Sequence, residues 1–248
     1  MVKNTGLYLM FVFLLIFAFN PAAGAADHTF SDTLSARKNS GKFTLTNLFN
    51  TGSMFYFTGV VSDDKPSFDT KLVYDNKGWG GLIFKSFELM QHNPGINYAL
   101  IVLNKRFQIG KRFLISPQIG VQLNQIGNIA GAGSDYLTNL TIAYKLTRYF
   151  TISNDAVMQN LILTNKANWT NRFKLSYQQA SVNISASLWD RNRVFGNPGY
   201  LSGGFYAGYS GIKLSSNMNL IVAASSISVF RADTPRKSGL MFSFGVAM

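Results

Sequence analysis

Residues 113–124 read Phe-Leu-Ile-Ser-Pro-Gln-Ile-Gly-Val-Gln-Leu-Asn, and this stretch decides the fold class of the chain. Every second position is apolar, at Phe113, Ile115, Pro117, Ile119, Val121 and Leu123. Apart from Leu114, the positions between them are polar or small, at Ser116, Gln118, Gly120, Gln122 and Asn124. Because successive side chains of a β-strand point to opposite faces, the segment predicts a strand with one oily and one wet side. Pro117 cannot donate a ladder hydrogen bond, so we expect a bulge there.

The same alternation returns along most of the chain. It predicts twelve strands, near residues 54–62, 68–75, 79–88, 97–107, 112–124, 135–146, 149–160, 168–178, 181–190, 199–213, 217–230 and 238–248. Short turns alternate with longer loops between them, which is typical of barrels with periplasmic turns and external loops. The prediction is an all-β fold, a closed antiparallel up-and-down transmembrane β-barrel. Because segments 79–88, 97–107 and 217–230 alternate poorly, ten or fourteen strands remain open alternatives.

The N-terminus has the pattern of an export signal. Lys3 is followed by an unbroken apolar run from Leu7 to Phe19 and then by the small residues Ala23 and Ala25. The run is shorter than the roughly 20 residues that cross a bilayer, so cleavage is favoured over a retained anchor. We predict a cleavable signal peptide over residues 1–25, a polar periplasmic leader over 26–53 with one possible extra strand, and the barrel over 54–248.

The composition also favours a barrel in lipid. The chain has no cysteine, 47% hydrophobic residues and 14% aromatic residues, and only 14% of its residues are charged. A soluble surface usually carries more charge, whereas strands that face lipid are rich in aromatic residues near the two interfaces. Alternation alone also fits a soluble β-sandwich, so that class is an open alternative.

The last predicted strand carries a motif of known barrels. A polar residue, a glycine and two alternating aromatics stand at Lys237, Gly239, Phe242 and Phe244. With the export signal and the alternating strands, the chain resembles the bacterial outer-membrane β-barrel proteins as a class. The resemblance implies that these four residues form the recognition signal for the barrel-assembly machinery. It also implies location in the outer membrane of a Gram-negative bacterium, in contact with lipid and lipopolysaccharide.

The polar face of each strand is predicted to line the lumen. The candidate lining residues are Lys71, Lys145, Asp155, Arg172, Lys174, Gln118, Gln122 and Asn139. Basic residues in a pore wall favour anions, which predicts a narrow channel for small polar or anionic solutes. Asp155 could instead neutralise Arg172 or Lys174 and plug the barrel, so a closed structural, assembly or ligand-binding barrel is the alternative.

An outer-membrane enzyme for lipid or peptide processing is the third and weakest reading. The only histidines are His28, in the leader, and His92, in an expected loop. No sequence pattern for a catalytic set, a metal or a cofactor accompanies them, so we predict neither catalysis nor a cofactor. The formal net charge of +12 is scattered along an exported chain. It therefore indicates anionic lipopolysaccharide or anionic solutes as partners and not nucleic acid.

Overall fold

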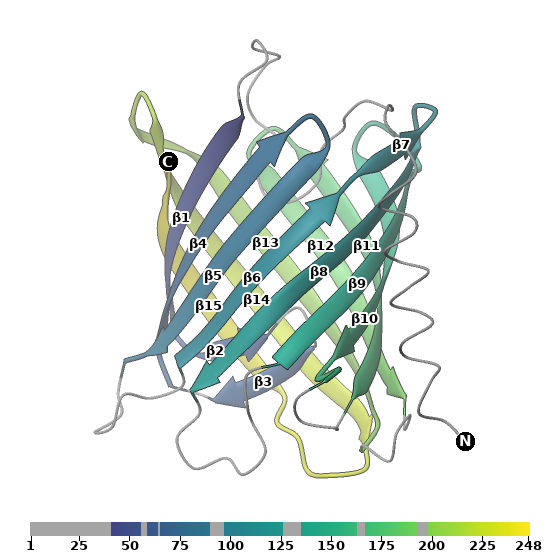
Figure 1. Cartoon of the computed structure of the whole chain (residues 1–248). Helices are drawn as coiled ribbons and strands as arrows, with labels where there is room; N and C mark the ends of the chain where they lie inside the picture. Colours follow the sequence, from purple (N-terminus) through teal and green to yellow (C-terminus); the bar gives the residue numbers. More distant parts are fainter. Residues whose placement is uncertain are drawn as a thin grey trace.

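A closed ring of antiparallel strands forms the body of the molecule (Figure 1). The structure is a computed structural model that describes residues 41–55, 59–63, 65–89, 97–125, 135–162, 167–192 and 198–248. Its strands are β1 (Lys42–Asn50), β2 (Ser53–Phe55), β3 (Val60–Asp63), β4 (Ser67–Asn76), β5 (Trp79–Glu88), β6 (Asn97–Lys105), β7 (Phe107–Ile109), β8 (Phe113–Gln125), β9 (Asp135–Lys145), β10 (Phe150–Gln159), β11 (Asn168–Gln179), β12 (Val182–Asn192), β13 (Tyr200–Ser215), β14 (Met218–Ala232) and β15 (Gly239–Ala247).

The ring closes because β1 pairs with both β4 and β15. From β4 to β15, each barrel strand pairs with the next one along the chain, and β6 and β7 both pair with β8. Since β6 and β7 are two parts of one strand, the thirteen-stranded sheet is a twelve-stranded barrel. The predicted fold class and strand count are therefore confirmed. Closure also leaves no unpaired sheet edge, which a barrel in lipid requires.

The first strand of the barrel differs from the predicted one. We expected the barrel to begin near residue 54, with residues 42–49 as an optional strand. Instead β1 closes the ring, and residues 53–55 and 60–63 pair as the separate hairpin β2–β3. β1 fits the wall because Phe43 and Phe49 lie on one face while Thr46 and Asn50 lie on the other, buried face. The signal peptide and residues 26–40 of the leader lie outside the described residues.

Pro117 does not produce the expected bulge. The register of β8 runs without a shift against β9 on one side and against β6 and β7 on the other. The proline acts differently: the neighbouring strand is interrupted at Arg106, between β6 and β7. Continuing the register places Lys105 opposite Pro117. The missing N–H of proline therefore ends the ladder locally without inserting a residue.

Short turns gather at one end of the barrel and longer connections at the other (Figure 1). Between β4 and β5 the turn is only Lys77 and Gly78, which both have positive φ, 46° and 80°. Positive φ at both central residues is the geometry that suits the twist of a two-residue hairpin. The C-terminus lies at this short-turn end, and the hairpin β2–β3 lies at the end with the longer connections.

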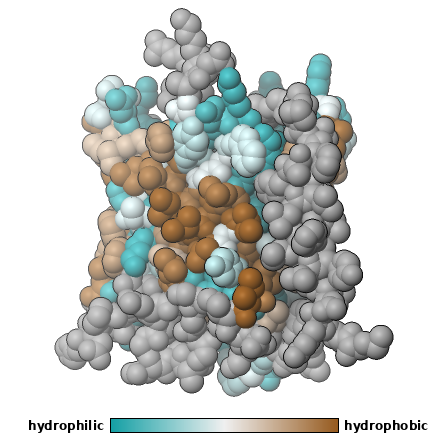
Figure 2. Space-filling model, in the orientation of Figure 1, coloured by the Kyte–Doolittle hydropathy of each residue, from teal (hydrophilic) through white to brown (hydrophobic). Residues whose placement is uncertain are grey.

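The two faces of the wall differ as the alternation predicted. Large apolar side chains stand exposed on the outside; Phe173, for example, is 52% exposed and Phe242 51% exposed. Figure 2 shows that such residues gather over the middle of the visible wall, with hydrophilic residues toward its upper end. No helix in the described part of the chain is long and apolar enough to span a membrane.

Candidate functional site

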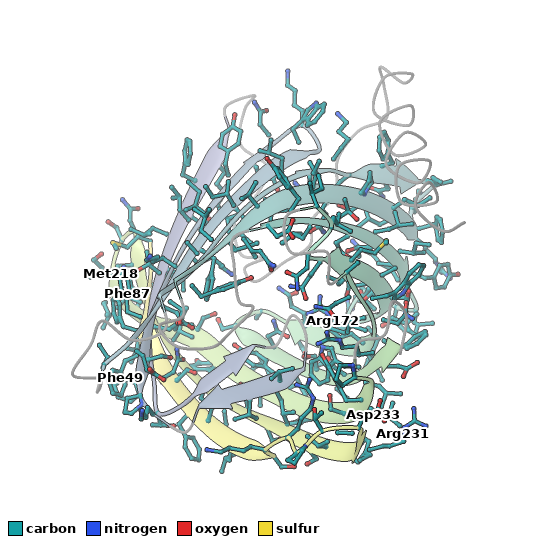
Figure 3. The ribbon with its side chains drawn as sticks, turned by 60° about the horizontal axis from the view of Figure 1, so that its bottom comes forward. Phe49, Phe87, Arg172, Met218, Arg231 and Asp233 are labelled. Carbon is teal, nitrogen blue, oxygen red and sulfur yellow. The ribbon has the colours of Figure 1, made fainter. Side chains whose placement is uncertain are left out.

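The inside of the barrel collects the polar residues that the sequence singled out. All eight candidate lining residues lie on strand positions that alternate with the exposed apolar belt, and so face inward: Lys71, Lys145, Asp155, Arg172, Lys174, Gln118, Gln122 and Asn139. Figure 3 shows Arg172 pointing into the interior. These residues do not form one site, because they are distributed over several strands and several heights of the wall.

A compact charged cluster lies on β9, β10 and β11. Arg172 donates from Nε and Nη2 to the same Asp155 oxygen, Oδ2, at 2.9 and 2.8 Å. The other carboxylate oxygen accepts a hydrogen bond from the Thr141 hydroxyl at 2.5 Å. Asp155 is buried, so both of its oxygens are satisfied inside the wall. Lys174 lies two residues along β11 on the same face and has no carboxylate within salt-bridge distance in the described part of the chain.

Amide side chains extend this polar surface toward the neighbouring strand. Gln118 on β8 and Asn139 on β9 each donate to the Thr141 hydroxyl at 3.3 Å. Closer to the long-loop end, Gln122 hydrogen-bonds with Asn160 and accepts a bond from Gln159 at 3.3 Å. The amides thus bond to one another and to hydroxyls, so the cations of this cluster are Arg172 and Lys174.

A second polar cluster lies on the opposite side of the ring. Asp69 on β4 accepts hydrogen bonds from Ser86 at 2.6 Å and from Asn50 at 2.9 Å. Along the ring, β4 is six strands from β11, by way of β1, β15, β14, β13 and β12. In a ring of twelve, that places Asp69 and Lys71 across the interior from Arg172 and Lys174. The sequence analysis did not name Asn50 and Ser86 because their role depends on this strand pairing.

Apolar residues occupy another part of the inner wall, which the sequence analysis missed. Leu100, Val102 and Leu137 form a buried cluster, and Leu82, Phe84 and Tyr98 pack against it. These residues alternate with outward apolar residues such as Ile101 and Leu103, so β5 and β6 are apolar on both faces. This explains the weak alternation of segments 79–88 and 97–107. The interior is therefore polar on some strands and apolar on others.

The hairpin β2–β3 leaves the wall and enters the barrel. It is connected to β1 and β4, and Figure 3 shows it inside the ring, over other strands of the wall. There Val60 and Val61 pack against a cluster of fully buried residues, Trp189, Tyr200 and Ile227, from β12, β13 and β14. The Ser202 hydroxyl donates to the Gly59 carbonyl at 3.0 Å. The hairpin thus crosses part of the interior as a strap.

Two arginines surround Tyr200 next to this strap. The guanidinium carbon of Arg236 lies 4.3 Å from the centre of the Tyr200 ring, and that of Arg191 lies 5.7 Å away. Arg191 also hydrogen-bonds with Asn168. Neither arginine forms an ion pair with the described residues. The sequence analysis did not single them out, because Arg236 lies in a connection and joins Tyr200 only through the tertiary fold.

The remaining predicted residues lie away from the interior cluster. Lys237 precedes β15, Gly239 begins it, and Phe242 and Phe244 point outward at 51% exposure each. Their role as an assembly signal stays a prediction. His28 and His92 lie outside the described residues, so the expectation that the chain is not an enzyme also stays a prediction.

Comparison with known proteins supports the architecture. No protein-family model matches the chain, and no curated protein matches its sequence. Among solved structures, it is similar to the KdgM porin, with a TM-score of 0.57, 10% identity, and coverage of 83% of this chain and 98% of that one. It is also similar to the NanC porin, with a TM-score of 0.52, 8% identity, and coverage of 84% and 99%. At such low identity the likeness concerns the fold alone: the chain is a closed β-barrel, as these bacterial outer-membrane porins are.

Proposed function

We propose that the protein is a narrow outer-membrane channel for small polar or anionic solutes. The observation that carries this proposal is the cluster of Arg172, Lys174 and Asp155 on the inner wall. Asp155 is already bonded to Arg172 and Thr141, so it offsets one cation of the two. Two cations against one anion leave a local excess of positive charge. An excess of positive charge in a pore wall attracts anions and repels cations.

The size of the barrel supports a narrow path. Eight-stranded barrels are filled by their own side chains, and barrels of sixteen strands leave a wide aqueous channel. A twelve-stranded ring lies between these cases, and here the hairpin β2–β3 takes up part of the interior. Small solutes fit such an interior better than folded proteins or long polymers.

The membrane location rests on three lines of support. The outside carries a belt of exposed apolar and aromatic residues, which matches the lipid-facing surface of outer-membrane barrels. The fold is that of known porins. The N-terminal sequence has the features of an export signal. On this proposal the partners are outer-membrane lipid, lipopolysaccharide and the barrel-assembly machinery of a Gram-negative cell.

A closed ligand-binding barrel is the second candidate. The observation in its favour is that the interior holds both the hairpin and the apolar cluster of Leu100, Val102 and Leu137. Buried apolar side chains in a lumen resist the passage of water and ions. This candidate predicts a stable barrel without ionic current.

Planar-bilayer recordings of the purified protein separate the two candidates. A channel gives discrete conductance steps, and a potassium chloride gradient gives a reversal potential that reports anion preference. The double variant R172Q/K174Q removes the local positive excess and should reduce that preference. Lys85→Gln is the matched control, because Lys85 lies on the outer face of β5 over the Phe87 ring. Absence of current at every voltage and salt concentration rejects the channel, and an unchanged reversal potential rejects the role of the two cations.

A further inference from the structure

We propose that the hairpin β2–β3 is packed permanently against Trp189 and forms the constriction that sets the size limit of the channel. We call Trp189, against which the hairpin packs, its seat. This inference rests on the proposed channel function. It assigns the limiting contact to one element, the paired strands β2 and β3, which are not part of the ring.

The base of the hairpin is fixed to two wall strands. The Ser67 hydroxyl on β4 donates to the Gly52 carbonyl at 3.2 Å and accepts a bond from the Asn50 amide at 3.2 Å. On the other side, Thr51 exchanges bonds with Phe242 on β15: the Thr51 N–H donates to the Phe242 carbonyl at 2.9 Å, and the Phe242 N–H donates to the Thr51 hydroxyl at 3.0 Å. These hydrogen bonds fix the point at which the chain leaves the wall and enters the interior of the barrel.

The far side of the hairpin is fixed to the inner face of β12, β13 and β14. Gly59 has a φ of +68° and lies so close to the Trp189 indole that a Cβ at position 59 would overlap the ring. Only glycine adopts this conformation and this close approach without strain. The Gly59 carbonyl accepts a bond from Ser202, and Val60 and Val61 pack on the buried cluster of Trp189, Tyr200 and Ile227. A segment held at both ends by hydrogen bonds and apolar burial is a fixed strap and not a free loop.

The seat also lies beside the charged cluster. Across the wall, Asp155 pairs in register with Arg172, Arg172 with Trp189, and Trp189 with Ser202. Neighbouring strands are about 4.8 Å apart, so the backbone of Ser202, whose side chain bonds to Gly59, lies about 10 Å along the wall from that of Arg172. The contact of the hairpin and the two cations thus lie on neighbouring strands of the same part of the wall. A solute that passes beside the hairpin there is also close to Arg172 and Lys174, which joins selection by size to selection by charge.

Trp189→Ala and Gly59→Val test the constriction. Both should unseat the hairpin, raise the single-channel conductance by roughly twofold or more, and admit larger neutral polyethylene glycols, because the narrowest part of the pore widens. Trp169→Ala is the matched control: Trp169 is on the adjacent strand β11 but on the outer face, where its indole nitrogen donates to Asn171. If the wild type conducts and both seat variants keep its conductance and polymer exclusion, the hairpin is not the constriction.

A second readout does not depend on transport. The chain has no cysteine, so Val61→Cys introduces a single reactive thiol on the seated hairpin. We expect slow labelling by a soluble thiol reagent, and labelling faster by roughly tenfold or more when Trp189→Ala is added, because local opening controls access. Fast labelling in both backgrounds overturns the seated hairpin. A barrel that never conducts but shows the expected difference in labelling refutes the channel and leaves the hairpin seat intact.

Discussion

Arg172 and Asp155 meet through a single carboxylate oxygen, with Nε and Nη2 of the arginine at 2.9 and 2.8 Å from Oδ2. The other oxygen of Asp155 is bonded to Thr141. Both carboxylate oxygens of Asp155 are therefore bonded to residues of the wall, and its ion pair is with Arg172 and not with Lys174. The sequence had left both pairings open. The difference matters because Lys174 is then the cation of this cluster that has no carboxylate within salt-bridge distance among the described residues.

Asp155→Asn should strengthen anion preference and weaken the barrel. The substitution removes the one negative charge of the cluster, which raises the positive excess in the interior. It also leaves a buried arginine without its counter-ion, a change that costs about 3–5 kcal/mol in buried pairs. Reversal potentials in a salt gradient and urea unfolding in lipid vesicles measure the two effects. Asp75→Asn is the control, because Asp75 pairs with Arg106 near the short-turn end and is more exposed. An anion preference equal to that of the wild type would contradict the assignment.

The double variant R191Q/R236Q should reduce the anion current that enters from the long-loop end. Two guanidinium groups beside Tyr200, which form no ion pair with the described residues, create a positive potential there that raises the local concentration of anions. The reduction in anion current should be smaller at about 1 M salt, where the Debye length is about 3 Å and the charges are screened. Current–voltage curves at two salt concentrations measure it. Arg231→Gln, an exposed arginine at the end of β14, is the control. A loss of current that is independent of salt argues against an electrostatic role.

Ile101→Arg should destabilise the barrel in lipid by about 2–4 kcal/mol, because a charge in the middle of the apolar belt must enter hydrocarbon. Ile101 lies at the centre of β6 and is exposed on the outer face. Leu146→Arg, at the short-turn end after β9, should cost only about 0–1 kcal/mol. Unfolding titrations in vesicles compare the two variants. Equal costs in vesicles would indicate that the belt does not face lipid.

Phe244→Ala should lower the amount of assembled barrel if β15 carries the assembly signal that the resemblance implies. The side chain faces outward and contacts Phe49 with ring centres 5.4 Å apart, so its loss leaves the interior unchanged. Heat-modifiable mobility of membrane fractions measures assembly. Phe230→Ala, an equally outward phenylalanine on β14, is the control. Equal yields of both variants would remove the special role of Phe244.

Local pattern was enough to predict most of the wall. Residues 113–124 gave the two faces of β8 correctly, and the expected segment 168–178 became β11 with Arg172 and Lys174 on its inner face. This worked because the period of a strand is fixed by its own backbone, and burial of one face selects the register. Where both faces of a strand are apolar, as in β5 and β6, the alternation of apolar and polar residues is weak although the strand is present.

The amino-acid sequence by itself determined a barrel of alternating strands with a basic interior, because side-chain direction in a strand is a local property. Only the tertiary structure decided that residues 42–50 close the ring and that the paired strands β2 and β3 lie inside it. It alone also placed Gly59 on Trp189 and Asp69 opposite Arg172. These relationships join residues that are far apart in the chain. They depend on closure of the ring, which the local alternation of residues along a strand does not encode.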